Sequence, residues 1–549
     1  MRLVDTQDGQ SLKKLESPSD LSESLGYKNR IKNGRTLDSF LLTGPVIYAC
    51  VDKFWTSFLE SRTFKNLTIT QADIPSLSHI VGRRRRTLLE HLWLRIALPN
   101  YGTSPCKRDE KPKVIWRLDA VFTRSVSDLW DVLSEWDSTG HKDMTLELGV
   151  FSPSDWASFM SHVCSVQQDV ELYKQYLASR STEQYEAVGD VHWPYIAMHR
   201  TFSPGQGLLT TAERKQHWFA TTNNLLGWKP LEFTDNAAEL PPVSVVTKFL
   251  IRRQQFREIY PTALNKMLES LLSIQDIHVE RWRCAESHDE KAWCKEAQRT
   301  FGLLLPPSVK SLSLYGDTSS ILQKWVAKQA TVVSLAKTLR QYTKNLECLS
   351  ISHLIDAKEF LHPFWPANSE EAIRLLPDWK NLKRLSLTSD IFNTGKEKDV
   401  NNLLCAAARA ARKMPSLEIL ELWNGNDERA SVFRYRANGE MTWRGTHIPA
   451  LNDEVIRAWE AVSVNNTRPC IRESFKPINT DDITSTRRVI DYLASKDQVL
   501  HPVSASRAIG KRKRNDLADY ERKAKKKKRR GAIQIRRVNV AWRNSTIRV

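Results

Sequence analysis

The sequence predicts an α/β fold: an irregular solenoid in which parallel strands alternate with helices, with disordered termini. Three observations favour this fold class. A hexamer with apolar residues at its first, fourth and sixth positions recurs along the chain, spacers with helical periodicity separate its copies, and both ends of the chain are polar. The 549 residues suffice for several ordinary domains or for one elongated array of repeats.

Five strong copies of the hexamer read IQDIHV, VKSLSL, LECLSI, LKRLSL and LEILEL, and they begin at residues 274, 309, 346, 382 and 417. Their spacings of 35, 37, 36 and 35 residues are nearly constant, which indicates a repeat architecture. In a strand the fourth and sixth positions point to the same face. We therefore predict adjacent, parallel strands at 277–279, 312–314, 349–351, 385–387 and 420–422.

The spacers between the hexamers show the periodicity of helices. Val332, Leu335 and Leu339 recur at helical spacing within 331–343, and the alanine-rich stretch 399–413 carries its apolar residues on one face. Each unit thus reads strand, loop, helix and return, so that stacked units form a parallel sheet with helices on one side. An unrelated α/β domain with buried parallel strands is the alternative.

Weaker copies of the pattern extend the array in the N-terminal direction, at 64–69, 89–94, 144–153 and 246–251. Residues 155–245 interrupt it with a stretch that is rich in aromatic residues, Gly and Pro and has no clear period. We expect an insertion of long loops over the solenoid there. Beyond the last hexamer, Asn438 and Gly439 are typical of a β-hairpin turn, and this hairpin is expected to cap the array.

The formal charge of +19 is concentrated at the C-terminus. Residues 511–549 carry 16 Lys or Arg and 3 Asp or Glu, a net charge of +13, which leaves +6 (19 minus 13) for residues 1–510. A block of like charge repels itself, so we expect this tail to be disordered. Its two basic clusters look like a bipartite nuclear localisation signal, made of Lys511, Arg512, Lys513, Arg514, Lys525, Lys526, Lys527, Lys528, Arg529 and Arg530.

A localisation signal of this kind implies a nuclear import receptor as a partner and the nucleus as the location. Without such a signal we expect the protein in the cytoplasm. Two alternatives stay open. The tail is a solvated basic segment without an address, or it binds nucleic acid non-specifically, because a dozen Lys and Arg residues on phosphates would release many counterions.

We find no catalytic signature, so we expect neither an enzyme nor a cofactor or metal site. The SPGQG stretch (203–207) is not followed by G-K-[ST], no G-x-S-x-G occurs, and His192 and His199 have no nearby ligand pair. The eight cysteines are scattered, which favours reduced thiols in an intracellular protein. Neither a membrane span nor an apolar secretory signal is visible.

The hexamers resemble those of leucine-rich-repeat proteins over about residues 274–422. The period is longer than the usual 20–29 residues. The Asn or Cys expected three positions after each hexamer is replaced by Trp282, Asp317, Leu354, Asp390 and Gly425. The resemblance implies a solenoid that is less regular than a smooth horseshoe.

Residues 45–69, PVIYACVDKFWTSFLESRTFKNLTI, resemble the second half of an F-box: an apolar helix with a Val…Trp pair, followed by the first solenoid strand. Over about 45–509 the chain is similar to a set of fungal F-box-like proteins of unassigned function. The segments that carry this likeness are RRRRTLLEHLWL (83–94), LIRRQQFREIYPTAL (250–264), IHVERWR (277–283), FRYRANGEMTWRGT (433–446) and HPVSASRAI (501–509).

This likeness implies a substrate-recruiting subunit of a ubiquitin ligase. Residues 20–44 do not supply the Leu-Pro…Ile…Leu helix of a complete F-box, so we expect weak or no binding to the ligase adaptor. The chain is thereby divided into a disordered N-terminus (1–40), a partial F-box-like helical segment (41–62), N-terminal repeats (63–154), an insertion (155–245), regular repeats (246–425), a hairpin and helical cap (426–509) and a basic disordered tail (510–549).

The favoured function is a protein–protein interaction scaffold that binds through the strand face of the solenoid. The residues between and just after the inward-pointing positions of each hexamer point away from the core, and we expect them to be exposed. They define a predicted partner-binding face of His278, Glu280, Ser313, Tyr315, Ser350, Ser352, Ser386, Thr388, Glu421 and Trp423. The alternative function is a nuclear, nucleic-acid-associated protein that uses the basic tail, although the near-neutral body favours the first reading.

Overall fold

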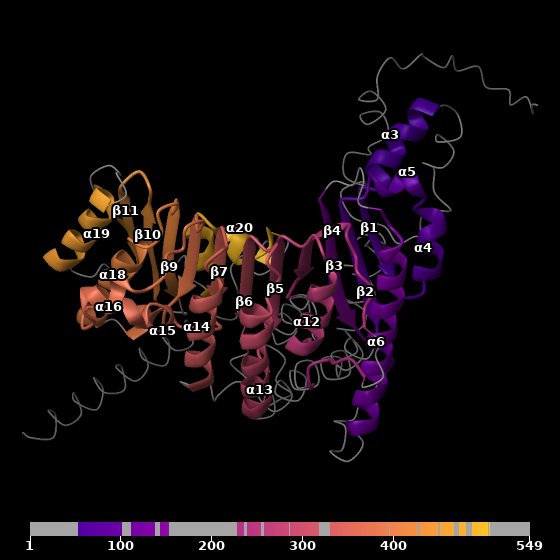
Figure 1. The fold of residues 1–549 in the computed structure, drawn as a ribbon, viewed down its shortest axis with the longest axis horizontal. Helices are drawn as coiled ribbons and strands as arrows, with labels where there is room; N and C mark the ends of the chain where they lie inside the picture. The colour runs from indigo at the N-terminus through magenta and orange to yellow at the C-terminus, as the bar shows by residue number, and fades with distance from the viewer. Residues whose placement is uncertain are drawn as a thin grey trace, which may run out of the picture.

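The structure is a computed structural model. It describes residues 53–100, 111–137, 143–152, 228–234, 239–253, 257–284, 286–317, 330–394, 396–425, 429–447, 451–465, 472–478, 486–502 and 504–505. These residues form an α/β fold around one twelve-stranded sheet, in which the strands lie in sequence order from β1 at one edge to β12 at the other (Figure 1).

The sheet is mostly parallel. All neighbours from β1 to β9 are parallel, β10 runs antiparallel to both β9 and β11, and β12 is parallel to β11. The strands are β1 (Asn66–Thr70), β2 (His91–Ala97), β3 (Met144–Phe151), β4 (Val246–Ile251), β5 (Asp276–Trp282), β6 (Ser311–Asp317), β7 (Cys348–Ser352), β8 (Arg384–Thr388), β9 (Ile419–Gly425), β10 (Ala430–Arg436), β11 (Glu440–Gly445) and β12 (Arg472–Pro477).

Helices connect most of the strands. They are α3 (Lys53–Thr63), α4 (Ile74–Ile80), α5 (Arg83–Arg86), α6 (Lys111–Ser134), α12 (Pro261–Ser270), α13 (Ser287–Gln298), α14 (Ala330–Tyr342), α15 (Ala357–Phe360), α16 (Glu370–Arg374), α17 (Ile391–Thr394), α18 (Glu397–Ala411), α19 (Asp453–Asn465) and α20 (Lys496–Val499). Short turns of other helix types are η4 (Arg299–Leu303), η5 (His362–Phe364) and η7 (Thr486–Tyr492).

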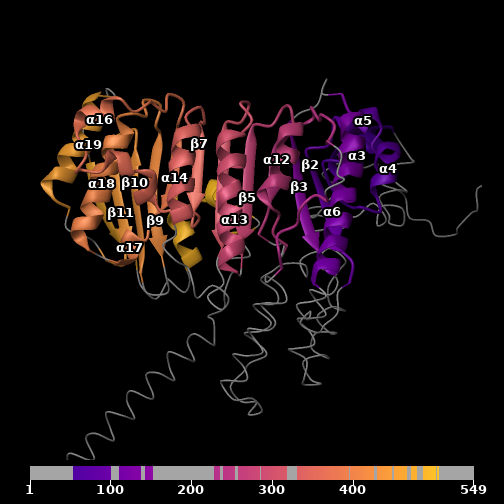
Figure 2. The same cartoon turned by 60° about the horizontal axis from the view of Figure 1, so that its bottom comes forward.

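The long helices α6, α12, α13, α14 and α18 lie side by side on one face of the sheet (Figure 2). We call this the helix face and the opposite one the second face. The alternation of the strands explains the difference between them: Leu312 and Leu314 of β6 pair in register with Leu349 and Ile351 of β7, and all four are buried on the helix face. Each such burial contributes about 1.5–3 kcal/mol relative to exposure.

The helices start and pack as their sequences direct. Pro261 occupies the first position of α12, where its missing N–H costs no hydrogen bond. In α18, Glu397 and Asp399 lie in the first turn and complement the positive end of the helix dipole. The alanines of α18 are almost all fully buried, because their small side chains let the helix lie close to the sheet.

The strand predictions are confirmed. The five strands predicted from the strong hexamers are β5 to β9, which are adjacent and parallel, and the weaker copies coincide with β1 to β4. The predicted helices at 331–343 and 399–413 correspond to α14 and α18. The predicted hairpin is β10 and β11, with Gly439 at a φ of 81°, a left-handed conformation that glycine adopts without strain.

Several predicted segments lie outside the described residues: the N-terminal 1–40, most of the 155–245 insertion and the basic tail 510–549. Within the ranges that the structure describes, no helix combines the length and the apolar character needed to cross a membrane.

Candidate functional site on the second face of the sheet

The predicted partner-binding residues lie together on the second face, in two rows across β5 to β9. In the first row, His278, Ser313, Ser350, Ser386 and Glu421 are successive neighbours in register. The second row holds Glu280, Tyr315, Ser352, Thr388 and Trp423. The period-2 alternation of each strand therefore placed these side chains correctly.

The expectation that these ten residues are exposed is wrong. Nine of them are buried, and the side chain of His278 is only 12% exposed. The cover is a segment that we call the strap: residues 486–502 and 504–505, which include η7 and α20. The strap belongs to the stretch 426–509 that we expected to cap the end of the array, yet it contacts β6, β7, β9 and β10 from the second face. Whether the face binds a partner stays a prediction.

The middle of the strap is anchored by the carboxylate of Glu421. This carboxylate accepts hydrogen bonds from the backbone N–H groups of Ala494 (2.8 Å) and Ser495 (2.9 Å), and from the hydroxyl of Ser495. Arg434 of β10 donates to it at 2.7 Å and also donates to the carbonyl of Tyr492 at 2.6 Å. The carboxylate thus binds the N–H groups that directly precede α20.

The C-terminal part of the strap is anchored by Glu280, which is fully buried. Its carboxylate accepts the backbone N–H of His501 at 2.6 Å and the backbone N–H of Arg253 at 3.0 Å, and it lies 2.9 Å from His278 Nε2. Burial alone would raise the pKa of Glu280, but the hydrogen bond and charge of His278 and the N–H of Arg253 outweigh burial and lower it. Burial, followed by the charge of Arg252, lowers the pKa of His501 to about 4, so His501 is neutral at pH 7.

Before and between the anchored residues the strap packs through aliphatic side chains. Its apolar side chains meet Tyr315, Trp423 and Val432 of the sheet in a small second core, and they are Val489, Ile490, Leu493, Val499 and Leu500. The indole N–H of Trp423 donates to Ser386 Oγ at 3.2 Å. The ring of His353, a residue with a positive φ of 58°, lies edge-on to the rings of Tyr315 and Trp423.

The second face over β2 to β4 has a different character. There Phe151, Arg95, Trp93 and Arg252 form a stack, with each guanidinium carbon 4.8–5.1 Å from the centre of a neighbouring ring. Phe151, Arg95 and Trp93 are only partly buried. Rings and guanidinium groups of this kind are frequent anchors of protein interfaces.

A buried carboxylate holds this stack in place. Glu147 of β3 pairs with Arg252 and lies 2.8 Å from Nε2 of His91. Burial alone would raise the pKa of Glu147, but the positive charge of Arg252 and the hydrogen bond with His91 lower it. Glu147 is therefore ionised at neutral pH and fixes the position of Arg252.

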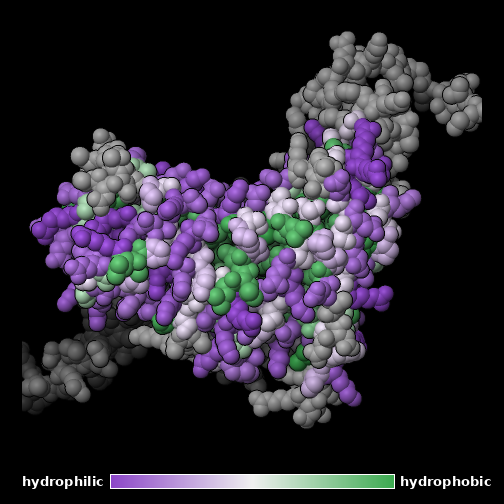
Figure 3. Space-filling view, in the orientation of Figure 1, coloured by the Kyte–Doolittle hydropathy of each residue, from purple (hydrophilic) through white to green (hydrophobic). Residues whose placement is uncertain are grey.

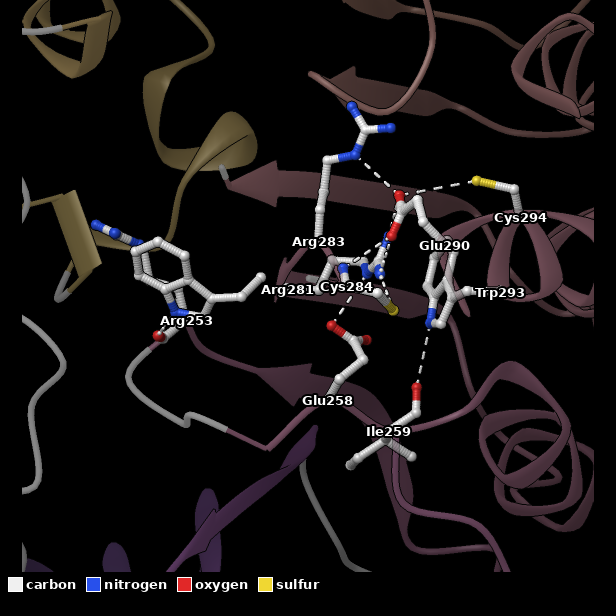
Figure 4. Close-up of polar contacts among 10 residues, drawn as sticks. Arg253, Glu258, Ile259, Arg281, Arg283, Cys284, Glu290, Trp293 and Cys294 are labelled. Carbon is white, nitrogen blue, oxygen red and sulfur yellow. Dashed lines mark hydrogen bonds and ion pairs between the residues drawn. The ribbon is translucent and has the colours of Figure 1, made fainter. Parts of the chain in front are cut away.

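A second ionic cluster lies at the carboxyl end of β5 (Figure 4). Arg281 pairs with Glu290 of α13 at 2.8 Å and with Glu258 at 3.0 Å, and its guanidinium carbon lies 3.6 Å from the centre of the Trp293 ring. Arg283 also pairs with Glu290, at 2.8 Å. The strand IHVERWR is thus fixed to α13 by two of its own arginines.

The two carboxylates of this cluster differ in ionisation. Burial raises the pKa of Glu258 to about 7, because the attraction of Arg281 offsets it only in part. Burial also opposes ionisation of Glu290, but Arg281 and Arg283 together lower its pKa to about 2. The cluster therefore holds one firmly ionised carboxylate and one that titrates near neutral pH.

The cysteines of the cluster are poor nucleophiles. Burial raises the pKa of Cys284 well above its ordinary value and that of Cys294 to about 11, where nearby Glu290 adds to the effect. Both are therefore neutral thiols at pH 7, whereas nucleophilic attack requires the thiolate. Among the described residues, no group of three or more His, Cys, Asp and Glu side chains is placed to hold a metal ion.

Other surface features bear on the alternatives. Of the four arginines in α5, Arg85 binds Glu60 at 2.7 Å, and Arg86 lies over the ring of Trp136. Half of this basic run therefore makes contacts within the protein.

Figure 3 shows a hydrophobic patch in the middle of a mostly hydrophilic surface. Leu272 and Leu303, which are 61% and 55% exposed, lie in the segments that lead into β5 and β6.

Sequence reasoning missed the strap and the residues that hold it. The segment HPVSASRAI was noted as part of a family likeness, but its sequence carries no signal that it returns over strands more than 200 positions earlier. Glu147 and Arg252 were likewise not singled out. Glutamates directly next to buried apolar residues of a strand are a usable signal, because Glu147, Glu280 and Glu421 all occupy such positions. All ten residues of the predicted localisation signal lie outside the described residues.

Comparison with protein families adds one finding. Residues 304–501, about a third of the chain, match a family of unknown function (DUF6546). The matched stretch begins just before β6 and ends at His501, so it includes the strap up to its second anchor and excludes the basic tail. None of the curated proteins matches the chain.

Proposed function

We propose that this protein is a protein–protein interaction scaffold that binds partners through the second face of its sheet. We further propose that the sheet is a leucine-rich-repeat-like solenoid and that the protein is an F-box-like substrate recruiter of a ubiquitin ligase. The observation that carries the proposal is the second face, which no long helix of the described part of the chain covers: a set of polar, aromatic and arginine side chains runs across its strands.

The partly exposed stack over β2 to β4 supports this function. Trp93, Arg95 and Phe151 present rings and a guanidinium group that are already held in place by Arg252 and Glu147. A partner that binds here loses little side-chain freedom in the protein, because the stack is ordered before binding. Aromatic and arginine side chains with fixed positions are typical of residues that dominate binding free energy.

The order of α3 and β1 supports the F-box-like part of the proposal. α3 ends three residues before β1, and Arg85 of α5 fixes Glu60 of α3 with two hydrogen bonds of 2.9 and 2.7 Å. The adaptor-binding half of an F-box would fall in residues 20–44, outside the described part of the chain. We expect weak or no adaptor binding, and recovery of stoichiometric adaptor with the full-length chain would contradict this expectation.

Site-specific cross-linking tests the face. A photo-reactive amino acid replaces Phe151 in the full-length chain, and a matched variant carries it in place of Leu375, which is 87% exposed and distant from the stack in sequence. We expect one or a few proteins to be cross-linked at position 151 and not at 375, and the yield to fall at least fivefold when Arg95 is also changed to Ala. Equal labelling at both positions would reject the second face as the binding surface.

The basic tail supports a second candidate, a nuclear protein that associates with nucleic acid. Twelve Lys or Arg against three acidic residues in 511–530 give this segment its charge. A cytoplasmic reporter fused to residues 505–535 tests the import function. We expect the reporter to enter the nucleus, and replacement of Lys525–Lys528 by Ala to reduce import more than replacement of Lys511–Arg514. A reporter that stays in the cytoplasm would reject the localisation signal. The remaining alternatives would then be a solvated tail or a segment that binds nucleic acid.

A further inference from the structure

We propose that the second face beneath the strap is a docking site for a short helical segment of a partner protein, and that the strap occupies this site as a displaceable internal ligand. This inference rests on the proposed function, because it assumes that the second face binds proteins. The partner segment that fits is a short helix preceded by residues whose N–H groups reach Glu421, with aliphatic side chains that reach Tyr315 and Trp423.

The strap satisfies the face incompletely. Ser350 Oγ and Ser352 Oγ, both on the second face of β7, are buried and have no hydrogen-bond partner within the described part of the chain. The side-chain amide of Gln498 in α20, which packs against β6 and β7, also lacks partners among the described residues for both its oxygen and its nitrogen. Buried polar groups are nearly always paired in a tightly fitted core, so an occupant with a suitably placed donor or acceptor would bind this face better.

Most contacts of the anchors are with the backbone of the strap, and the hydroxyl of Ser495 also donates to Glu421. Glu421 accepts the N–H groups of Ala494 and Ser495, and Glu280 accepts the N–H of His501. Every non-proline residue offers the same N–H group. A segment from another protein can therefore satisfy both carboxylates if its aliphatic positions match those of Leu493 and Leu500 and a hydroxyl takes the place of Ser495.

The site also tolerates the loss of the strap. Without it, Glu421 keeps the ion pair with Arg434, and Glu280 keeps His278 and the N–H of Arg253. Neither carboxylate would be left as an isolated charge, which is the costly outcome when a buried ion pair is broken. The hydroxyl groups of Ser313, Ser350 and Ser386 would meet water.

The position of the strap in the chain permits its release. It follows β12, so all twelve strands are complete before it begins. Its regular elements are η7 and the four-residue α20, and both are too short to be stable alone. Undocking therefore breaks only the contacts between the strap and the second face.

Hydrogen exchange on the full-length, unmodified chain tests whether the strap is detachable. We expect the amides of Ala494, Ser495 and His501 to exchange at least tenfold faster than those at the centres of β6 to β8, because local opening frees them without global unfolding. Exchange of the strap at the same rate as the strands would overturn the inference, since the strap would then be part of the core.

A peptide of residues 486–505 with a fluorescent label then tests docking from outside. We expect the wild-type chain to bind it weakly, and the full-length Leu493→Asp variant to bind it at least tenfold more tightly, because the aspartate loosens the internal strap. Phe475→Asp, which changes a side chain that is 42% exposed on β12, serves as the matched control and should bind the peptide as the wild type does. Adding Glu421→Gln to the Leu493→Asp variant should abolish the gain.

The remaining outcomes are decisive as well. No gain in peptide binding by a folded Leu493→Asp variant overturns the inference. A dimer that forms as this variant is concentrated would assign the site to the strap of a second copy, which contradicts a partner protein as the occupant. Failure of these tests leaves the stack over β2 to β4 untouched, whereas failure of the cross-linking test at position 151 removes the proposed function itself.

Discussion

On the helix face of β7, Leu349 and Ile351 are buried among the leucines of neighbouring strands, whereas on the second face of the same strand Ser350 and Ser352 are buried beneath the strap. At β7 the two faces are both buried, but they are covered by different chemistry. The helix face is closed by long helices and apolar contacts. The second face is closed by about twenty residues that are held by two carboxylates and a small apolar cluster.

This difference separates the part of the sequence that determines the fold from the part that we assign to binding. Apolar burial is non-directional and strong, so the helix face fixes the register of every strand. Polar burial with carboxylate anchors contributes little net stability, yet it fixes where the backbone of the covering segment lies. A face of the second kind resembles a protein interface more than it resembles a core.

The largest expected effect on stability comes from a substitution on the helix face. Leu385→Ala should lower the free energy of unfolding by about 2–5 kcal/mol, because Leu385 is 1% exposed and its loss leaves a cavity. Its neighbour Ser386→Ala, on the second face of β8, is the matched control and should cost about 0.5–1.5 kcal/mol, since it removes the acceptor of the Trp423 N–H. Chemical denaturation measures both, and equal losses would contradict the contrast between the faces.

The next largest effect comes from a substitution on the second face, and it tests whether the strap opens independently of the sheet. Glu421→Gln weakens the anchor of the strap and should increase amide exchange at Ala494 and Ser495 by about 10- to 100-fold, which corresponds to about 1–3 kcal/mol. Exchange in β6 and β7 should change much less, because undocking does not break the sheet. A loss of protection that is uniform over strap and strands would show that the two faces unfold together.

The helix face was predictable because its signal is repeated. Five hexamers with leucines or isoleucines at fixed positions fix β5 to β9, and weaker copies locate β1 to β4. The ten residues of the second face were placed correctly for the same reason, because each lies one position from a buried leucine, isoleucine or valine. The pattern of a strand determines where its side chains point, and it contains no information about what covers them.

The strap and the ionic clusters were not predictable for that reason. Glu280 is joined to His501 across 221 positions of the chain, and no local periodicity encodes so distant a contact. Arg281 and Glu290 also lie on different elements, and Arg281 reads in sequence as an ordinary polar residue at a strand end. Predicting such pairs requires the three-dimensional arrangement of the sheet, because the desolvation that makes them matter arises only on folding.

A comparison between the ionic clusters on the two faces gives a third, smaller effect. The pKa of Glu258, at the helix-face cluster, is raised to about 7, so the folded state binds a proton more tightly than the unfolded state does. The tighter proton binding by Glu258 stabilises the folded state. This stabilisation is complete below about pH 4.5 and is lost as the pH rises through 7. Because one pKa unit corresponds to about 1.4 kcal/mol, we expect Glu258→Gln to flatten the decline in unfolding free energy between pH 5 and 8 by about 1–2 kcal/mol.

The matched control for that titration is on the second face. The pKa of Glu280 is lowered, so its contribution is present at neutral pH and is lost only as the pH falls through the acidic range. Glu280→Gln should therefore leave the slope between pH 5 and 8 as it is in the wild type. Equal slopes for Glu258→Gln and the wild type would show that Glu258 is already ionised in the folded protein.

The smallest effect concerns the incomplete fit of the strap. Ser350→Ala removes a buried hydroxyl that has no hydrogen-bond partner in the described part of the chain, so the substitution should be neutral or should stabilise the protein by less than about 1 kcal/mol. Ser386→Ala, one strand away in the same row, should have the opposite sign because that hydroxyl accepts the Trp423 N–H. Thermal denaturation with both variants measured side by side resolves the signs. If Ser350→Ala instead destabilises as Ser386→Ala does, the Ser350 hydroxyl is hydrogen-bonded by buried water, and the second face beneath the strap is more completely satisfied than its contacts with the strap indicate.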